Sequence, residues 1–238
     1  MVELSPTTRD ALLRVGTSTL TGVLSRRGLR NMFLQDVWPI RPDLPRMVGL
    51  AFTMRFIPFR EDKTGAAGRG PLQQQAMEQC PPGYVLVVDA RGDARAASAG
   101  DLFVGRLKAR GCAGIVTDGG LRDTEGVAKT GLPAYHRRPS SPPSGIVHQP
   151  MDLNLPIACG GVAVYPGDVI VGDCDGIVVI PPDIVDAVAE EALASTLYDE
   201  FAEAEVARGR SLVGLFPAAG EEAKRDFETW KKARATAS

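Results

Sequence analysis

The stretch GDLFVGRLKARGCAGIVTDGGLRD, residues 100–123, carries most of the information about the fold. Its first half predicts a helix over about 100–110, and the apolar run at 114–117 predicts a buried strand. Ten helical residues advance about 15 Å in one direction, and a strand of about five residues returns roughly 16 Å. We therefore expect Arg122 and Asp123 to emerge beside the N-terminus of the predicted helix.

The flanking segments continue this alternation of strands and helices. β-Branched, aromatic or apolar runs predict further strands at 48–58, 84–89 and 132–136, and a series of strands and tight turns over 156–180. Spacing near 3.6 residues and start or stop residues predict helices at 6–28, 72–79, 182–208 and about 221–233. Gly-rich or Pro- and Ser-rich composition predicts irregular loops at 60–71 and 137–150.

This order predicts an α/β protein in which central β-layers are flanked by helices and followed by a long C-terminal helix. With 238 residues and no repeat or linker, we expect one domain over 1–238. Its core would cover about 10–210, and a C-terminal helical extension would cover 183–238.

Composition narrows the classes of function. The net charge is -2 and no segment is densely basic, so nucleic-acid binding by a basic face has little support. No apolar stretch reaches 18 residues, and the N-terminus lacks an apolar signal core, so we expect a cytoplasmic protein without a membrane span. The four cysteines form no C-x-x-C pair and there are two histidines, which argues against a structural zinc site.

The predicted meeting point of helix and loop has complementary chemistry. Free backbone N–H groups of residues 101–103 at the helix N-terminus suit a carboxylate, and Arg122 adds a permanently charged, bidentate donor. Asp101 and Asp123 supply hard oxygen ligands, which favour Mg²⁺ or Mn²⁺. A metal bound there would polarise a carbonyl and stabilise an enolate.

A purely structural interpretation of these residues stays open. Asp101 could cap its helix, and Arg122 with Asp123 could form a surface ion pair. The acid Asp118 and the diglycine 119–120 favour a binding role, because glycines let the backbone approach a ligand closely.

The spacing of Asp101 and the Arg122-Asp123 pair, with GDLF at one end and VTDGGLRD at the other, resembles the RraA-like family. That family includes 4-hydroxy-4-methyl-2-oxoglutarate aldolases, oxaloacetate decarboxylases and regulators of ribonuclease activity A. The resemblance covers roughly residues 10–210. Its other motifs are VGLAFT at 48–53, PPGYVLVVD at 81–89, LPAY at 132–135 and VYPGDVIVGDCDGIVVIP at 164–181.

The resemblance implies a β/β/α swivelling-type fold and homotrimers or homohexamers with sites near subunit interfaces. It implies that the helix start at Gly100, Asp101, Leu102 and Phe103 binds the pyruvate carboxylate, and that Arg122 holds substrate oxygens. Asp123 would ligate the metal directly and Asp101 would act through metal-bound water. An acidic residue from a neighbour's C-terminal helix would assist, and Glu200 is the best candidate for it.

The function expected from these residues is a divalent-metal-dependent (class II) lyase. It would cleave a 4-hydroxy-2-oxo acid to pyruvate, with Mg²⁺ or Mn²⁺ as cofactor and oxaloacetate decarboxylation as a side activity. A Schiff-base aldolase has less support, because no lysine lies in an apolar strand where desolvation would lower its pKa. The alternative from another class is a protein that binds and inhibits a ribonuclease complex.

Two segments depart from the family pattern and leave the substrate tail open. Residues 60–71 are longer than expected, and 136–150 are particular to this sequence; both would line the outer pocket. His136 is a possible acid or base, although a single histidine after a short strand is more often structural.

Overall fold

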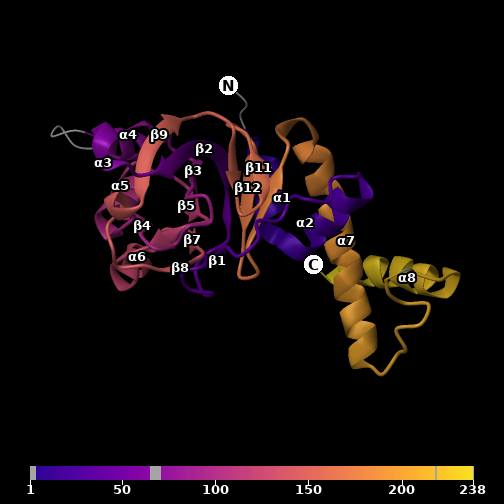
Figure 1. Cartoon of the computed structure of the whole chain (residues 1–238). Helices are drawn as coiled ribbons and strands as arrows, with labels where there is room; N and C mark the ends of the chain where they lie inside the picture. Colours follow the sequence, from indigo (N-terminus) through magenta and orange to yellow (C-terminus); the bar gives the residue numbers. More distant parts are fainter. Residues whose placement is uncertain (1–3, 65–70, 218, 238) are drawn as a thin grey trace.

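The computed structural model describes residues 4–64, 71–217 and 219–237. A main sheet of eight strands curls until it is nearly closed (Figure 1), in the order β1-β7-β5-β3-β2-β12-β13, with β9 also paired to β2. The strands are β1 (Trp38–Pro39), β2 (Met47–Pro58), β3 (Tyr84–Asp89), β5 (Gly114–Thr117), β7 (Ala134–His136), β9 (His148–Leu153), β12 (Val169–Gly172) and β13 (Ile177–Ile180).

Two small sheets complete the β-structure. The three-stranded sheet has β6 between β4 and β8, with both pairs parallel, and the two-stranded sheet is an antiparallel hairpin. Their strands are β4 (Ala97–Ala99), β6 (Gly120–Leu121), β8 (Arg138–Pro139), β10 (Ile157–Cys159) and β11 (Val162–Val164).

The helices form two groups on either side of the main sheet, and α8 extends away from the sheet beside α7 (Figure 1). The first group lies around the parallel strands: α3 (Glu61–Thr64), α4 (Leu72–Gln79), α5 (Asp101–Ala109), α6 (Thr124–Thr130) and the 3-10 turn η1 (Ser144–Ile146). The second group lies at the β12-β13 end: α1 (Pro6–Arg14), α2 (Thr17–Arg26), the 3-10 turn η2 (Pro182–Ile184), α7 (Val185–Ala207) and α8 (Glu221–Ala237). None of the described helices is both long and apolar enough to cross a membrane.

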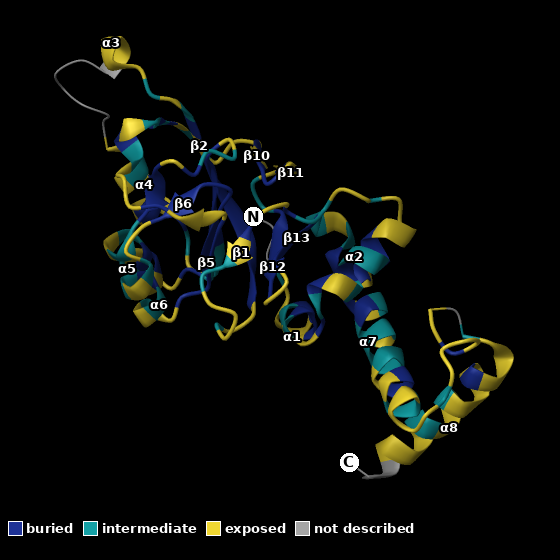
Figure 2. Cartoon of the chain, turned by 60° about the horizontal axis from the view of Figure 1, so that its bottom comes forward, coloured by how far each residue is buried: buried dark blue, intermediate teal, exposed yellow. Residues whose placement is uncertain are grey.

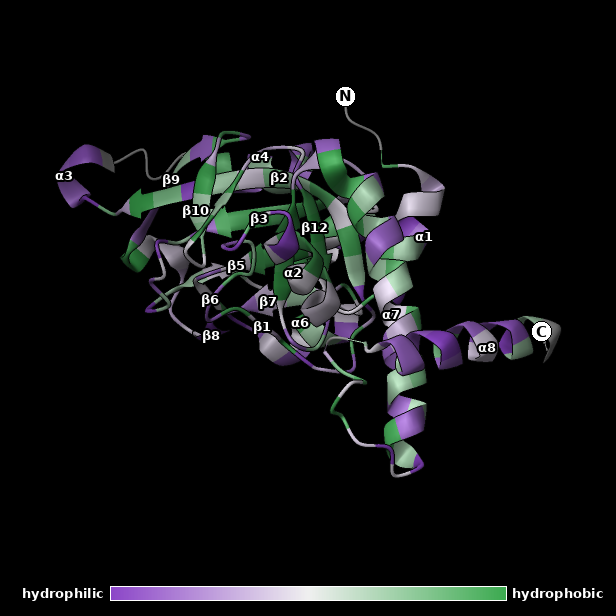
Figure 3. Ribbon diagram, turned by 90° about the vertical axis from the view of Figure 1, so that its right-hand side faces the viewer, coloured by the Kyte–Doolittle hydropathy of each residue, from purple (hydrophilic) through white to green (hydrophobic). Residues whose placement is uncertain are grey.

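The apolar strands sit between these two groups. β2, β3, β5 and β7 run parallel in the middle of the sheet, and every residue of β5 is buried. Strands covered on both faces need such continuous apolar runs, which is why 84–89 and 114–117 are recognisable in the sequence. Figure 3 shows these strands as the hydrophobic centre of the chain, with α8 largely hydrophilic.

Helix α8 folds back on α7 and forms a separate apolar cluster. Tyr198 of α7 contacts Phe227 of α8, and Phe201 of α7 contacts both Phe227 and Trp230, with ring centroids 5.0–5.9 Å apart. Most of the outer surface of α8 is exposed (Figure 2). The long amphipathic helix and the short final helix were both expected, and the aromatic contacts explain why α8 is held against α7.

The predicted fold class is confirmed, and four element predictions need correction. The helix over 6–28 is interrupted at Val15-Gly16, so it is two helices. The long helix begins at Val185, after a 3-10 turn. Part of the predicted loop at 60–71 is the helical turn α3, and 65–70 lie outside the described residues. The segment 137–150 is not wholly irregular, because it holds β8, η1 and the start of β9.

Candidate active site

The helix–strand return brings the two ends of the 100–123 stretch together, as the spacing predicted. The Arg122 backbone N–H donates to the carbonyl of Ala99 at 3.0 Å, directly before α5 begins. The contact is close enough that a Cβ atom on Gly100 would lie 2.7 Å from Oδ2 of Asp123 and 3.0 Å from Cγ of Arg122. A glycine at this position therefore leaves room for both side chains.

These residues line a pocket of about 350 Å³. One side is the start of α5, from Gly100 to Phe103, together with Arg122 and Asp123. Leu102 extends into solvent with 85% of its surface exposed. The pocket is concave, open to solvent and sized for a small ligand.

Asp123 presents its carboxylate to this pocket because of an unusual backbone conformation. Its φ of 53° and ψ of 42° lie in the left-handed region, which Asp and Asn adopt more readily than most residues. It occupies the N-cap of α6, yet its side chain makes no capping hydrogen bond. Instead, Oδ2 accepts from Nε of Arg122 at 2.9 Å, and both side chains stay more than 40% exposed.

Asp101 is the first residue of α5, and Gly100 is the N-cap. Its Oδ1 accepts from the backbone N–H of Leu102 at 2.7 Å. Its Oδ2 lies against α6, where a Cβ atom on Gly126 would come within 2.7 Å. The expected set of free N–H groups is thus reduced, because Leu102 already donates to Asp101.

The donor set fits a hard divalent cation. Asp123 and Asp101 contribute carboxylate oxygens on neighbouring helix starts, and Mg²⁺ completes its shell with waters when one or two carboxylates bind it. Each carboxylate lies against a glycine, Asp123 against Gly100 and Asp101 against Gly126. A larger residue at either glycine would fill the space that the carboxylate occupies. Arg122 binds Asp123 through Nε alone, and its two terminal Nη atoms have no hydrogen-bond or ion-pair partner among the described residues.

Asp118 and the two glycines after it have a packing role. Asp118 is buried and accepts from the backbone N–H groups of Ala90 and Gly92 at 2.7 and 2.9 Å. Burial raises the pKa of its carboxyl. A Cβ on Gly119 would come within 2.6 Å of Ala90, and one on Gly120 within 2.5 Å of Ser140. The diglycine is therefore explained by close packing against neighbouring residues of the same chain. The predicted role, in which these glycines let the backbone approach a ligand, is not needed to explain them.

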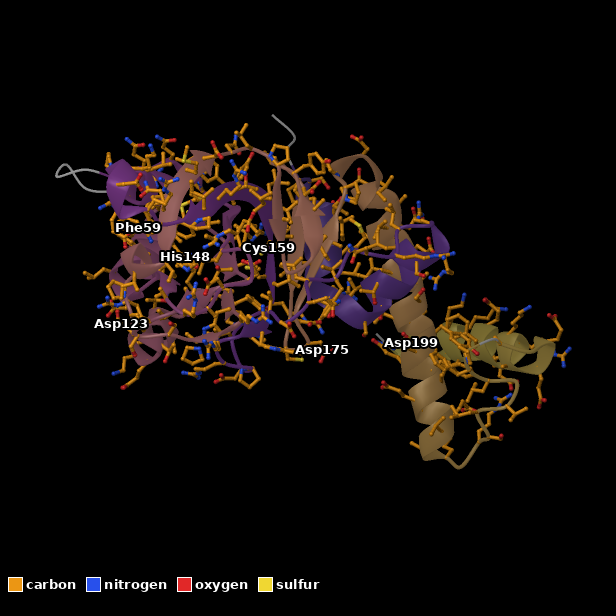
Figure 4. All side chains as sticks on the ribbon, viewed as in Figure 1. Phe59, Asp123, His148, Cys159, Asp175 and Asp199 are labelled. Atoms are coloured by element: carbon orange, nitrogen blue, oxygen red, sulfur yellow. The ribbon has the colours of Figure 1, made fainter. Side chains whose placement is uncertain are left out.

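Glu200 lies away from this pocket in its own chain. It is on α7, where it forms an ion pair with Arg234 of α8. Figure 4 shows its neighbour Asp199 and the pocket residue Asp123 at opposite ends of the molecule. Glu200 could therefore assist only the pocket of another copy, and that role stays a prediction.

The other candidates are not at the pocket. His136 is buried at the end of β7, where it pairs with Trp38 of β1, and burial lowers its pKa to about 4. No lysine is among the described residues that line the pocket. Asp173, Cys174 and Asp175 form the one described group of three possible metal ligands. Asp173 is already occupied there, since its two oxygens accept from the backbone and hydroxyl of Thr17 at 2.8 Å.

Sequence reasoning missed the opposite wall of the pocket. It is lined by Gln73 and Gln74 of α4, by Pro143 directly before η1 and by Ser144, the first residue of η1. No motif or spacing marks them, since Gln73 is one of three consecutive glutamines and Ser144 belongs to a Pro- and Ser-rich segment. The expectation that 136–150 lines the outer pocket holds for residues 143 and 144.

Comparisons with known proteins agree on a family. A Halalkalibacterium halodurans protein, provisionally named as a 4-hydroxy-4-methyl-2-oxoglutarate aldolase, is 39% identical over 138 residues, which are 57% of this chain and 64% of that protein. The match thus covers less than two thirds of that relative. An Ectopseudomonas mendocina protein of the same name is 37% identical over 42% of this chain and 60% of its own.

Solved structures share the fold. A Streptomyces coelicolor protein, described as an unusual member of the RNase ES inhibitor RraA family, has a TM-score of 0.76 and 31% identity over 84% of this chain and 98% of its own. An uncharacterized Pseudomonas syringae protein has a TM-score of 0.79 and 24% identity over 89% and 93%, which supports the fold alone. The family model described as RraA-like, Aldolase/RraA, matches residues 14–179, and the chain therefore belongs to the RraA-like family.

Proposed function

We propose that this protein is a lyase that cleaves the C3–C4 bond of a 4-hydroxy-2-oxo acid and releases pyruvate. The observation that carries the proposal is the convergence of Arg122, Asp123 and Asp101 with the N-terminus of α5 on one small pocket. The aldolase names of the bacterial relatives support the same reaction class. Oxaloacetate decarboxylation forms the same enolate and is proposed as a side activity.

Substrate binding would use the charged side of the pocket. The remaining N–H groups at the start of α5 and the positive end of its dipole suit the substrate carboxylate. The Nη atoms of Arg122 would bind the carboxylate and the 2-oxo oxygen as a fork. These contacts would hold the oxo acid with C3 and C4 directed toward the rest of the pocket.

Bond cleavage moves one proton and one electron pair. The C4 hydroxyl would give its proton to a water in the pocket and become an aldehyde or ketone carbonyl, while the C3–C4 electron pair would form the enolate of pyruvate. Arg122 would stabilise the enolate oxygen, and return of the proton from that water to C3 would complete the product. Asp123, with Asp101, would hold Mg²⁺ or Mn²⁺, which supplies Lewis-acid polarisation of the 2-oxo group when bound.

The test is pyruvate release from 4-hydroxy-2-oxo acids and from oxaloacetate, with and without EDTA. We expect chelation and Asp123→Ala each to abolish activity, and added Mg²⁺ or Mn²⁺ to restore the chelated enzyme. Borohydride with pyruvate should trap no adduct, because no described lysine lines the pocket. Activity that survives both EDTA and Asp123→Ala would exclude this mechanism.

A second candidate function rests on the Streptomyces coelicolor neighbour, which is described as belonging to a family of ribonuclease inhibitors. In that case the chain would bind a ribonuclease and need no substrate. A pull-down with ribonuclease E-type enzymes, together with a lyase assay that yields no pyruvate, would favour it. We also propose a homotrimer or homohexamer in which Glu200 of one copy reaches the pocket of the next.

A further inference from the structure

The pocket has two chemically different ends joined by a short strand. Ala97 and Ala99 of β4 both line it. Arg122 is attached at one end of β4 through the carbonyl of Ala99, at 3.0 Å. At the other end, the backbone N–H of Ala97 donates to the carbonyl of Pro142 at 2.9 Å, which brings Ser144 to the pocket. Two strand residues separate these ends by about 6–7 Å.

The end away from Arg122 is organised around one amide. Gln73 lies in the first turn of α4, which packs between α5 and β9 (Figure 1). Its Nε2 donates to the carbonyl of Ser98 at 2.6 Å, and its Oε1 accepts from the hydroxyl of Ser144 at 3.2 Å. These two contacts connect α4 with β4 and with the start of η1, and they fix the direction of the amide.

The hydrogen-bonding groups that remain free at this wall are uncharged, and they include both donors and acceptors. A glutamine amide has two N–H donors, so one remains after the bond to Ser98, and Oε1 and the Ser144 oxygen keep unused lone pairs. A hydroxyl group, which both donates and accepts, satisfies such a wall. A carboxylate accepts only, and its charge would lie against the lone pairs of Oε1 and Oγ.

We propose that Gln73 and Ser144 select 4-hydroxy-2-oxo acids whose chain beyond C4 carries hydroxyl groups, that is, 2-oxo-3-deoxy sugar acids. The inference rests on the proposed function, since it places the 2-oxo acid group at Arg122. With the carboxylate held there, C5 and C6 of an extended substrate reach along Ala99 and Ala97 to the amide. The substrate in the relatives' names carries a second carboxylate instead, so the two preferences are distinct.

Three substrates with the same reacting atoms but different tails test which tail the pocket prefers. 2-Oxo-3-deoxygluconate has a hydroxylated tail, 4-hydroxy-2-oxoglutarate a carboxylate and 4-hydroxy-2-oxopentanoate a methyl group. Each releases pyruvate by the same cleavage, which lactate dehydrogenase reports continuously. We expect kcat/KM of the Mg²⁺-loaded protein to be at least about tenfold higher for the hydroxylated substrate than for either of the others, the effect of one or two hydrogen bonds.

Variants at the wall should change this ratio selectively. Gln73→Leu keeps a side chain of similar bulk but removes both hydrogen-bonding groups, and we expect kcat/KM for the hydroxylated substrate to fall about tenfold. The methyl substrate should change less than about twofold, because it makes no hydrogen bond there. Ser144→Ala should act in the same direction with a smaller effect, and it carries the test if Gln73→Leu does not fold.

Matched controls lie on the same segments. Gln75→Leu changes an exposed glutamine of α4 that does not line the pocket, and Ser141→Ala changes an exposed serine outside it; neither should alter the ratio. A uniform fall for all three substrates in Gln73→Leu, or a wild-type preference for the carboxylate tail, would overturn the inference alone. No pyruvate from any of the three would overturn the proposed function and this inference with it.

Discussion

Asp123 has a left-handed backbone conformation, and its carboxylate makes no capping hydrogen bond to α6. The first property explains the second. A left-handed residue at the start of α6 turns its side chain away from the helix and toward Gly100. Asn tolerates that conformation as well as Asp does, so a change to Asn removes the charge while keeping the backbone.

Asp123→Asn should therefore separate activity from folding. We expect pyruvate release to fall by on the order of 100-fold or more, because the proposed metal ligand, which is also the ion-pair partner of Arg122, loses its charge. The free energy of unfolding should change by less than about 0.5 kcal/mol, as is usual for an exposed side chain. Steady-state kinetics and urea unfolding measure the two effects; a large loss of stability would mean that Asp123 is mainly structural.

His136 should make stability depend on pH. Burial lowers its pKa from the ordinary 6.5 to about 4, so the unfolded chain takes up the proton first as the pH falls. The stabilisation is complete above pH 6.5 and is lost progressively toward pH 4. Between pH 7 and pH 5, wild type should lose roughly 2 kcal/mol more than His136→Gln. Urea unfolding at both pH values tests this, and equal losses in the two proteins would contradict it.

Helix α5 offers a matched pair of glycine substitutions. In Gly100→Ala the new Cβ would meet Asp123 and Arg122, both exposed side chains that can move, so the cost in stability should stay near 1 kcal/mol. Activity should fall at least tenfold because both groups are displaced.

The control for this substitution is Gly105→Ala in the same helix, where a Cβ meets nothing within 4 Å. It should stabilise the protein by about 0.5–1 kcal/mol through helix propensity and leave activity unchanged. Thermal unfolding and the pyruvate assay report both. If Gly100→Ala retains full activity, the close approach at Gly100 is not part of the site.

The success of sequence-based prediction at the level of elements follows from burial. Residues 84–89, 114–117 and 72–79 were predicted with the observed bounds because continuous apolar runs and a Pro-Pro-Gly stop are unambiguous. Strand β9 was missed because Pro150 argues against a strand. Pro150 pairs with Phe56 at an irregularity in the β2-β9 register, a position where proline is tolerated.

The residues of the candidate site also fall into those that the sequence predicts and those that it does not. Asp101, Arg122 and Asp123 could be placed from the sequence, because helix rise and strand length are fixed quantities over one short connection. Gln73 and Ser144 could not, since they lie 71 residues apart and meet only through tertiary packing. Their role at the pocket depends on where α4 and η1 rest, which local pattern does not encode.

At the scale of the whole molecule, helix α5, whose start lines the pocket, lies far from helix α7 (Figure 1), and Figure 4 shows Asp123 of the pocket equally far from Asp199 of α7. If Glu200 of a neighbouring copy completes the site, Asp123→Asn and Glu200→Gln should each be inactive alone. Mixing the two variants after reversible dissociation should restore part of the activity, because some pockets then receive both wild-type residues. Failure of any mixture to recover, with confirmed subunit exchange, would remove Glu200 from the site.

The hydroxyls of Ser98 and Thr117 meet at 2.8 Å beneath β4. Because side chains alternate along a strand, this buried pair decides that Ala97 and Ala99 face the ligand. A slip of one residue would turn the serine into the cavity and hide both alanines. The two methyl groups on the pocket surface are therefore held in place by a hydrogen bond on the other face of β4. Ser98→Val would remove that hydrogen bond without changing any residue that lines the pocket.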